Sequence, residues 1–150
     1  STLMRSSAAS DVYKRQKLNI IIGTHGHFGE ELVKSAELIT GKMEGVQVVS
    51  LLPTMSFEDF MKQAEEVLST TEKPYIVLVD LFGGTPCNVF TVLSRKYNYD
   101  VVSGVNLPML IDLYVKTLTM EDADIDTDEL AEGCIKVLKE SGVHTNKQLD

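Results

Sequence analysis

An apolar segment that ends abruptly in glycines, a threonine and two histidines constrains this chain most strongly. Residues 20–22 are all isoleucine, and β-branched runs are typical of strands buried on both faces of a parallel sheet. Beyond the break, apolar residues recur with helical spacing at Phe28, Leu32, Val33, Ala36 and Ile39. The Gly-Thr-His-Gly motif at 23–26 therefore occupies a strand-to-helix turn. Such a turn directs N–H groups and the positive end of a helix dipole at one point, which favours a bound anion such as phosphate.

Composition excludes several classes of protein. The chain has 150 residues, 43% of them hydrophobic, which suits a single globular domain. Its net charge of −8 and the absence of a basic stripe argue against nucleic acid as a partner. No apolar run approaches the roughly 20 residues that a membrane-spanning helix needs, so we expect a cytoplasmic protein without direct membrane insertion. Cys87 and Cys134 lie far apart and are predicted to be buried and unpaired.

Residues 1–16 differ in charge balance from the rest and show no sustained periodicity. Residues 11–16 can be back-translated into the transposon-end sequence used in sequencing libraries. We therefore expect 1–16 to be a non-native leader and 17–150 to be the domain. A natural flexible tail is the alternative interpretation.

From residue 17 onward, strand-like and helix-like segments alternate, which is typical of an α/β fold with a parallel sheet. Strands are predicted at 17–22, 46–51, 75–79 and 99–103. Helices are predicted at about 28–41, after Ser56, after Thr85, at 108–118 and over 130–138. The acidic segment 121–129 is predicted to be a connection and the N-cap region of the last helix. We expect an open, mostly parallel sheet of order 2-1-3-4 with helices on both faces. Residues 143–149 are predicted to form either an antiparallel edge strand or a frayed tail.

A second turn resembles the first in its chemistry. The third predicted strand ends at Asp80, and Gly83 and Gly84 then allow close approach of the backbone. Thr85 is the predicted N-cap of the next helix, with Pro86 in its first turn. This is a second helix start at which an anion could bind.

These two turns are predicted to meet at one place. In an open α/β sheet, ligands bind beyond the carboxyl ends of the strands, where the strand order reverses. His25 and Asp80 would be neighbours there, and a carboxylate that accepts Nδ1–H leaves Nε2 free as a nucleophile. Gly26, Gly84 and Thr85 could then hold phosphoryl oxygens. A structural, hydrogen-bonding histidine is the alternative for His25.

Three motifs together resemble a known family. They are Gly-Thr-His-Gly at 23–26, Leu-Val-Asp-Leu-Phe-Gly-Gly-Thr-Pro at 78–86 and Gly-Val-Asn-Leu-Pro-Met-Leu at 104–110. In this order they are similar to the mannose-family IIA proteins of the bacterial sugar phosphotransferase system. The resemblance covers roughly residues 17–150.

The resemblance implies a phosphorelay. We expect no cofactor and no metal, because His25 and His27 could form half of a metal site but have no nearby third ligand in the sequence. The phosphocarrier HPr would phosphorylate His25 at Nε2, with Asp80 orienting the imidazole and Thr85 contacting the phosphate. His25 would pass the group to a IIB component and through it to a membrane IIC/IID permease. The resemblance also implies a homodimer that exchanges a C-terminal edge strand, for which residues 143–149 are the candidate. The sugar stays open.

Other interpretations remain at this point. Within the same fold, the chain could instead be the phosphocarrier subunit that serves dihydroxyacetone kinase. A receiver-like signalling module would use Asp80 as phosphoacceptor. Such a module needs acidic residues after the first strand to hold magnesium, and this chain has Gly-Thr-His-Gly there. His27 matches a variable family position, and we assign it no catalytic role. Asn106 and Pro108 are predicted either to line the site or to form a turn and helix start.

Overall fold

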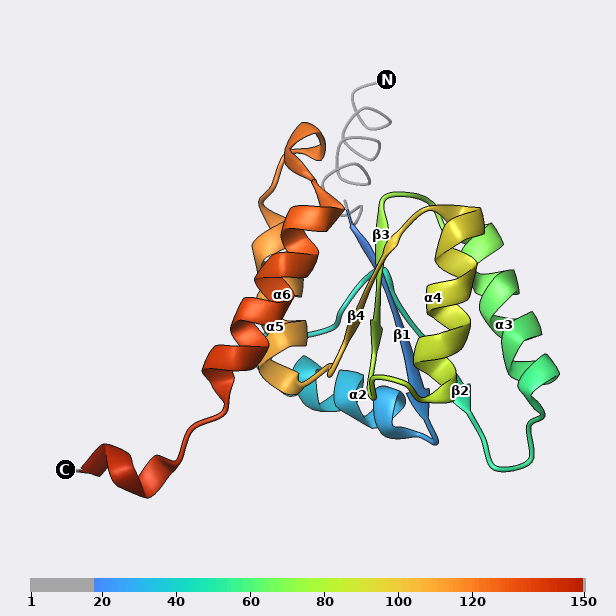
Figure 1. Ribbon diagram of the computed structural model, residues 1–150. Coiled ribbons are helices and arrows are strands. Elements are labelled where there is room, and N and C mark those ends of the chain that lie inside the picture. Colours follow the sequence, from blue (N-terminus) through green and yellow to red (C-terminus); the bar gives the residue numbers. More distant parts are fainter. Residues whose placement is uncertain (1–17, 150) are drawn as a thin grey trace.

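A four-stranded parallel sheet forms the centre of the domain (Figure 1). The computed structural model describes residues 18–149, so the predicted leader at 1–16 lies outside the described residues. The strands are β1 (Asn19–His25), β2 (Val46–Leu51), β3 (Tyr75–Val79) and β4 (Asp100–Ser103). Their order is β2-β1-β3-β4, which confirms the predicted α/β fold and strand order.

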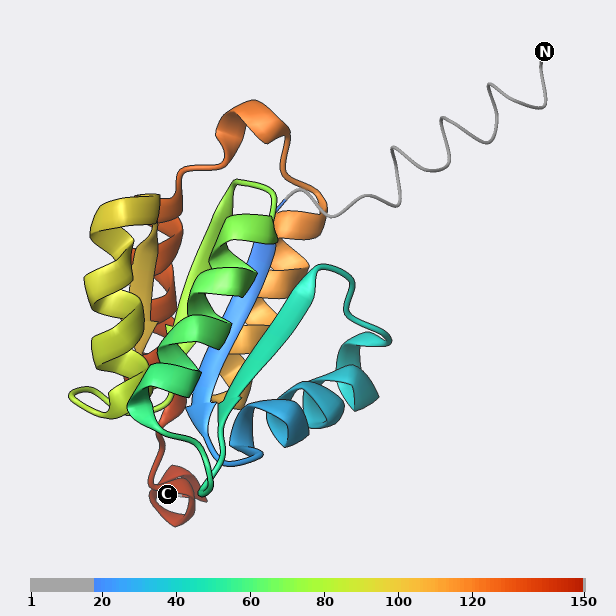
Figure 2. The ribbon, with the colours of Figure 1, turned by 90° about the vertical axis from the view of Figure 1, so that its right-hand side faces the viewer.

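Helices cover both faces of this sheet (Figures 1 and 2). They are α2 (Phe28–Thr40), α3 (Phe57–Thr70), α4 (Thr85–Tyr97), α5 (Leu107–Leu118) and α6 (Thr127–Ser141). Helices α2, α5 and α6 enclose one apolar core with Ile20, Ile22 and Leu78 of the sheet. Helices α3 and α4 enclose the other with Ile21 and Val77. Alternate residues of β1 thus enter opposite cores, which explains its unbroken run of isoleucines.

The strand register brings the ends of β1, β2 and β3 to one edge of the sheet. Gly23 is opposite Val79, and His25 is opposite Leu51. The backbone N–H of Gly26 donates to the carbonyl of Leu51 at 2.8 Å, so the turn after β1 stays attached to β2. His25 is therefore the last residue of a strand held on both sides.

Several predicted boundaries need correction. Strand β1 extends to His25 instead of ending at residue 22, because the motif itself pairs with β2. The N-cap of α4 is Gly84, in an extended conformation, and Thr85 is already the first helical residue. The predicted N-cap region within the acidic segment is confirmed, because Asp126 caps α6 by accepting hydrogen bonds from the N–H groups of Asp128 and Glu129, and the helix begins at Thr127. The capping role of Ser56 is confirmed, as part of a capping box with Asp59.

The C-terminal segment is not a strand in the single chain. Thr145–Leu149 is a 3-10 turn whose residues are all exposed, and the chain leads it away from the sheet (Figure 1). Its side chains are mostly polar, so they have little to gain from packing on the domain itself. The exchange of this segment between two subunits stays a prediction.

Both cysteines are buried and free, as predicted. Burial raises the pKa of the Cys134 thiol to about 11, so this thiol stays protonated at neutral pH. Cys87 is a residue of α4 and packs into the core that α3 and α4 enclose. Neither side chain has the exposure that reactive cysteines require.

Gly23 is required by close packing in the core. A Cβ atom at this position would lie 2.5 Å from Cε2 of Phe90, whose side chain is fully buried. We therefore expect Gly23→Ala to lower the free energy of unfolding by about 1–3 kcal/mol through overpacking, measured by urea denaturation. Gly142→Ala is the matched control, because no atom lies within 4 Å of its Cβ position. Equal stability of the two variants would contradict this account.

Candidate functional site

His25 and Asp80 meet at the carboxyl edge of the sheet, as their positions after β1 and β3 predict. Oδ2 of Asp80 lies 3.0 Å from Nδ1 of His25 and also accepts the backbone N–H of His25 at 3.0 Å. An ionised carboxylate can only accept, so Nδ1 carries the proton and Nε2 keeps its lone pair. The arrangement is that of an oriented imidazole with a free nucleophilic nitrogen.

Burial differs sharply between the two partners. The side chain of His25 is 46% exposed, whereas that of Asp80 is 13% exposed. The second oxygen of Asp80, Oδ1, is buried and has no hydrogen-bond partner within residues 18–149. The carboxylate therefore contacts His25 from the buried side of the ring, and the exposed side of the ring is accessible to a partner. A positive charge on the imidazole would be stabilised by this carboxylate.

The imidazole ring lies against the start of α4. A Cβ atom on Gly84 would be 2.7 Å from Cε1 of His25 and 3.3 Å from Nε2, so only glycine leaves room for the ring. The backbone N–H of Gly84 already donates to the carbonyl of Leu81, so it is not available to a ligand. Gly84 therefore contributes to the site by having no side chain. Gly84 brings Nε2 to the N-terminus of a helix.

This helix start is suited to an anion. Helix α4 has no acidic residue in its first turn and no side-chain cap. Within the described chain, no hydrogen bond occupies the backbone N–H of Thr85 or of Cys87, or the hydroxyl of Thr85. Uncompensated N–H groups and the helix dipole together attract negative charge. The start of α4 is therefore suited to an anion beside Nε2 of His25.

The start of α2 is less suited to an anion. Glu30 and Glu31 lie in its first turn, and the N–H of Gly26 is already bonded to Leu51. Gly26 adopts a φ of +55°, so its clear role is to make the turn. A phosphate contact by Gly26 stays a prediction. His27 is the N-cap of α2, and its Nδ1 contacts Oε2 of Glu30, away from the Asp80 pair.

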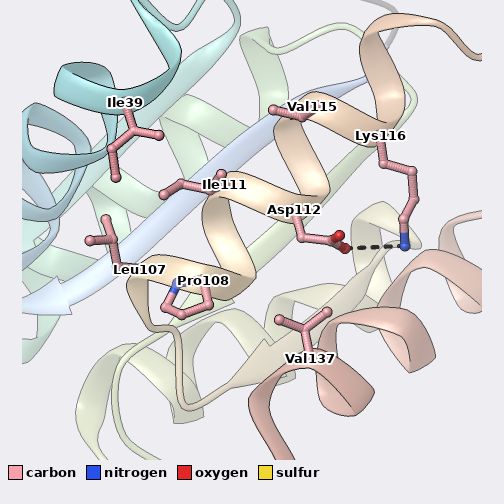
Figure 3. A pocket seen from close by; sticks show the side chains of 8 residues that line it. All are labelled: Ile39, Leu107, Pro108, Ile111, Asp112, Val115, Lys116 and Val137. Atoms are coloured by element: carbon pink, nitrogen blue, oxygen red, sulfur yellow. Dashed lines mark ion pairs between the residues drawn. The ribbon is translucent and has the colours of Figure 1, made fainter. Parts of the chain in front are cut away.

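Asn106 and Pro108 belong to a turn and helix start, the second of the two predicted roles. Oδ1 of Asn106 caps α5 by accepting the N–H of Met109, and its Nδ2 donates to Oγ of Ser141. Pro108 instead lines an apolar groove of about 690 Å³ between α2, α5 and α6 (Figure 3). Neither His25 nor Asp80 lines this groove. It is therefore separate from the candidate site.

The sequence motifs did not predict a role for two large apolar side chains beside the site. Leu81 and Phe82 directly follow Asp80 and are 58% and 84% exposed. Large apolar residues in a short turn between a buried strand and two glycines are a signal that could have identified them. Exposed apolar groups beside a reactive side chain are typical of a surface that a protein partner covers.

Comparison with known proteins shows the family of the chain. The EIIA-man family model, described as the PTS system fructose IIA component, matches residues 19–140. The chain belongs to this family. The mannose-specific EIIAB component of Escherichia coli K12 is 37% identical over 114 residues, which are 74% of this chain and 34% of that protein. The chain thus spans about a third of the length of this EIIA-man relative.

Solved structures of EIIA proteins share the fold. A phosphotransferase system component EIIA from Streptococcus agalactiae has a TM-score of 0.78 and 32% identity, covering 87% of this chain and 98% of its own. The mannose/sorbose-specific IIA subunit from Enterococcus faecalis has a TM-score of 0.74 and 28% identity, covering 83% and 92%. Within residues 18–149, none of the helices is both long and apolar enough to cross a membrane.

Removal of the Asp80 carboxylate should change the tautomer of His25. In the native protein we expect the neutral ring to carry its proton on Nδ1, because Nδ1 is the ring nitrogen that has an acceptor within residues 18–149. In Asp80→Ala we expect a mixture shifted toward the Nε2–H form, measured from the ¹⁵N shifts of the ring. Glu30→Ala is the control, because Glu30 contacts His27 and not His25. An unchanged His25 tautomer in Asp80→Ala would show that the hydrogen bond does not control the ring.

Proposed function

We propose that this EIIA-man domain is a phosphocarrier of a sugar phosphotransferase system, with His25 as the phosphorylated residue. The observation that carries the proposal is the hydrogen bond from His25 Nδ1 to Asp80, which leaves Nε2 free beside the N-terminus of α4. The phosphoryl group would come from phosphorylated HPr and pass to a IIB component. The name of the Escherichia coli relative combines A and B components, which supports a IIB component as a partner.

The chemistry is an in-line displacement at phosphorus. The lone pair of His25 Nε2 would form the new N–P bond while the bond from phosphorus to the donor imidazole breaks and its electron pair returns to the donor nitrogen. Asp80 would accept the hydrogen bond from Nδ1–H throughout and stabilise the positively charged ring. The start of α4 and the Thr85 hydroxyl would bind the transferred oxygens. Transfer to IIB reverses these steps.

The proposed setting is the cytoplasmic side of a sugar transporter. A IIB component would carry the phosphoryl group onward to substrate at a membrane IIC/IID permease. Curated relatives are named for mannose, fructose and sorbose. The sugar is selected by components other than this domain, so we assign no sugar.

We also propose a homodimer that exchanges the C-terminal segment. Strand β4 is at the edge of the sheet, and a hollow of about 500 Å³ beside it is lined by Cys87 of α4, Val101 of β4 and Ala131 of α6. The exposed segment Thr145–Leu149 projects from the domain (Figure 1). A strand from a second copy would satisfy the unpaired groups of β4. These features support the exchange that the sequence predicts.

Phosphorylation of His25 can be tested directly. The chain is incubated with phosphoenolpyruvate, the first enzyme of the system and HPr, and the product is tested for acid-labile, base-stable phosphate. We expect His25→Ala to abolish this phosphate, because His25 places its Nε2 beside the start of α4.

His27→Ala is the matched control for that experiment. His27 is an exposed histidine two residues away, and its ring contacts Glu30. We expect this variant to be phosphorylated to the native extent. Phosphate that persists in His25→Ala, or disappears only in His27→Ala, would refute the assignment.

The exposed apolar pair should contribute to partner binding. We expect Phe82→Ala to raise the KM for phosphorylated HPr by about tenfold, corresponding to the 1–2 kcal/mol that a buried aromatic anchor contributes. The rate at saturating donor should change little, because the apolar side chain of Phe82 has no group that takes part in the proposed displacement. Leu38→Ala is the control, since Leu38 is 89% exposed near the far end of α2. Equal KM values for the two variants would exclude Phe82 from the interface.

A further inference from the structure

Two polar side chains of the described domain are fully buried, and one of them adjoins His25. These are Thr24 and Thr117, both 0% exposed. Thr117 donates its hydroxyl to carbonyls of its own helix, α5. Thr24 instead makes a contact between elements, because its Oγ1 accepts the backbone N–H of Gly29 in α2 at 2.8 Å. Burial of a hydroxyl is costly unless it is bonded, so this bond is required at that position.

The bond supplies what α2 lacks at its start. The N-cap residue of α2 is His27, and its side chain makes no capping hydrogen bond. Gly29 is the second residue of the helix, where the N–H normally bonds to the N-cap side chain. Thr24, which lies in β1, takes over this role. The first turn of α2 is thereby attached to the strand that ends in His25.

The attachment is unusually close. A Cβ atom on Gly29 would lie 3.0 Å from Oγ1 of Thr24 and 2.9 Å from Cγ1 of Val48. Helix α2 can therefore approach β1 and β2 this closely only because residue 29 is glycine. The two residues act together, because Gly29 leaves space by having no side chain and Thr24 provides the hydrogen-bond acceptor.

This pair acts on the face of the sheet opposite the imidazole. Thr24 faces α2, whereas His25, the next residue of the strand, faces the start of α4. The His25 backbone is held by Asp80 on one side, and the following residue, Gly26, by Leu51 on the other. The bond between Thr24 and Gly29 adds a third attachment, which opposes rotation of the chain between β1 and α2.

We propose that Thr24 is a positioning residue for phosphoryl transfer, acting through the backbone of His25 by anchoring α2 to the end of β1. The inference rests on the proposed function of His25. A small displacement of a nucleophile is enough to slow an in-line transfer strongly. Loss of the Thr24 hydroxyl should therefore affect the chemical step more than donor binding.

The test compares Thr24→Val with Thr117→Val, each of which removes one fully buried hydroxyl. We expect Thr24→Val to lower kcat for transfer from phosphorylated HPr by about tenfold with KM little changed. We expect the ¹⁵N shifts of the His25 ring to move in the same variant. Thr24→Ser, which keeps the acceptor, should restore both the rate and the shifts. Thr117→Val should leave both at native values.

Gly29→Ala is the second variant, for use if Thr24→Val does not fold. It keeps the hydroxyl but forces α2 away from β1, so the proposal expects the same loss of kcat and the same shift of the His25 signals. Native kcat and native His25 shifts in Thr24→Val or Gly29→Ala would overturn the inference. Absence of phosphorylation in the native chain would instead refute the proposed function, so the two failures are distinguishable.

Discussion

The parallel pairing of β1 with β3 is the constraint on which the candidate site depends. Parallel strands place their carboxyl ends at the same edge, and the register of Gly23 opposite Val79 brings the next residues of both strands together. His25 and Asp80 are 55 residues apart in the chain and become hydrogen-bonded neighbours for this reason alone. Every further element of the site, including the start of α4, is positioned relative to that edge.

Electrostatics in the site contrast with those of the whole chain. The protein carries a net charge of −8, which would repel a phosphate. The start of α4, however, has no acidic residue in its first turn, whereas α2 and α3 each have two. The one carboxylate in the site, Asp80, is largely buried below the ring and is directed at Nδ1. Negative charge is thus kept away from the place where a phosphoryl group would bind.

The sequence could predict the elements better than their ends. The alternation of strands and helices followed from periodicity. With the order 2-1-3-4 expected for such a sheet, the proximity of His25 to Asp80 followed from the rule that ligands bind at carboxyl ends. The N-cap of α4 was predicted one residue too late, because Thr85 is the better capping residue type while backbone conformation assigns the cap to Gly84. The C-terminal segment was ambiguous, because its conformation depends on what it packs against.

The sequence by itself determined the α/β class, the central buried strand and the residue types available for phosphoryl chemistry, because periodicity and turn residues are local properties. Only the tertiary structure decided how those residues are used. Gly84 is needed for the His25 ring, and Gly29 for the bond to Thr24. Both requirements arise from the approach of a helix to a strand, and no local pattern encodes that distance. The residue types of the site could therefore be predicted from the sequence, whereas their contacts could not.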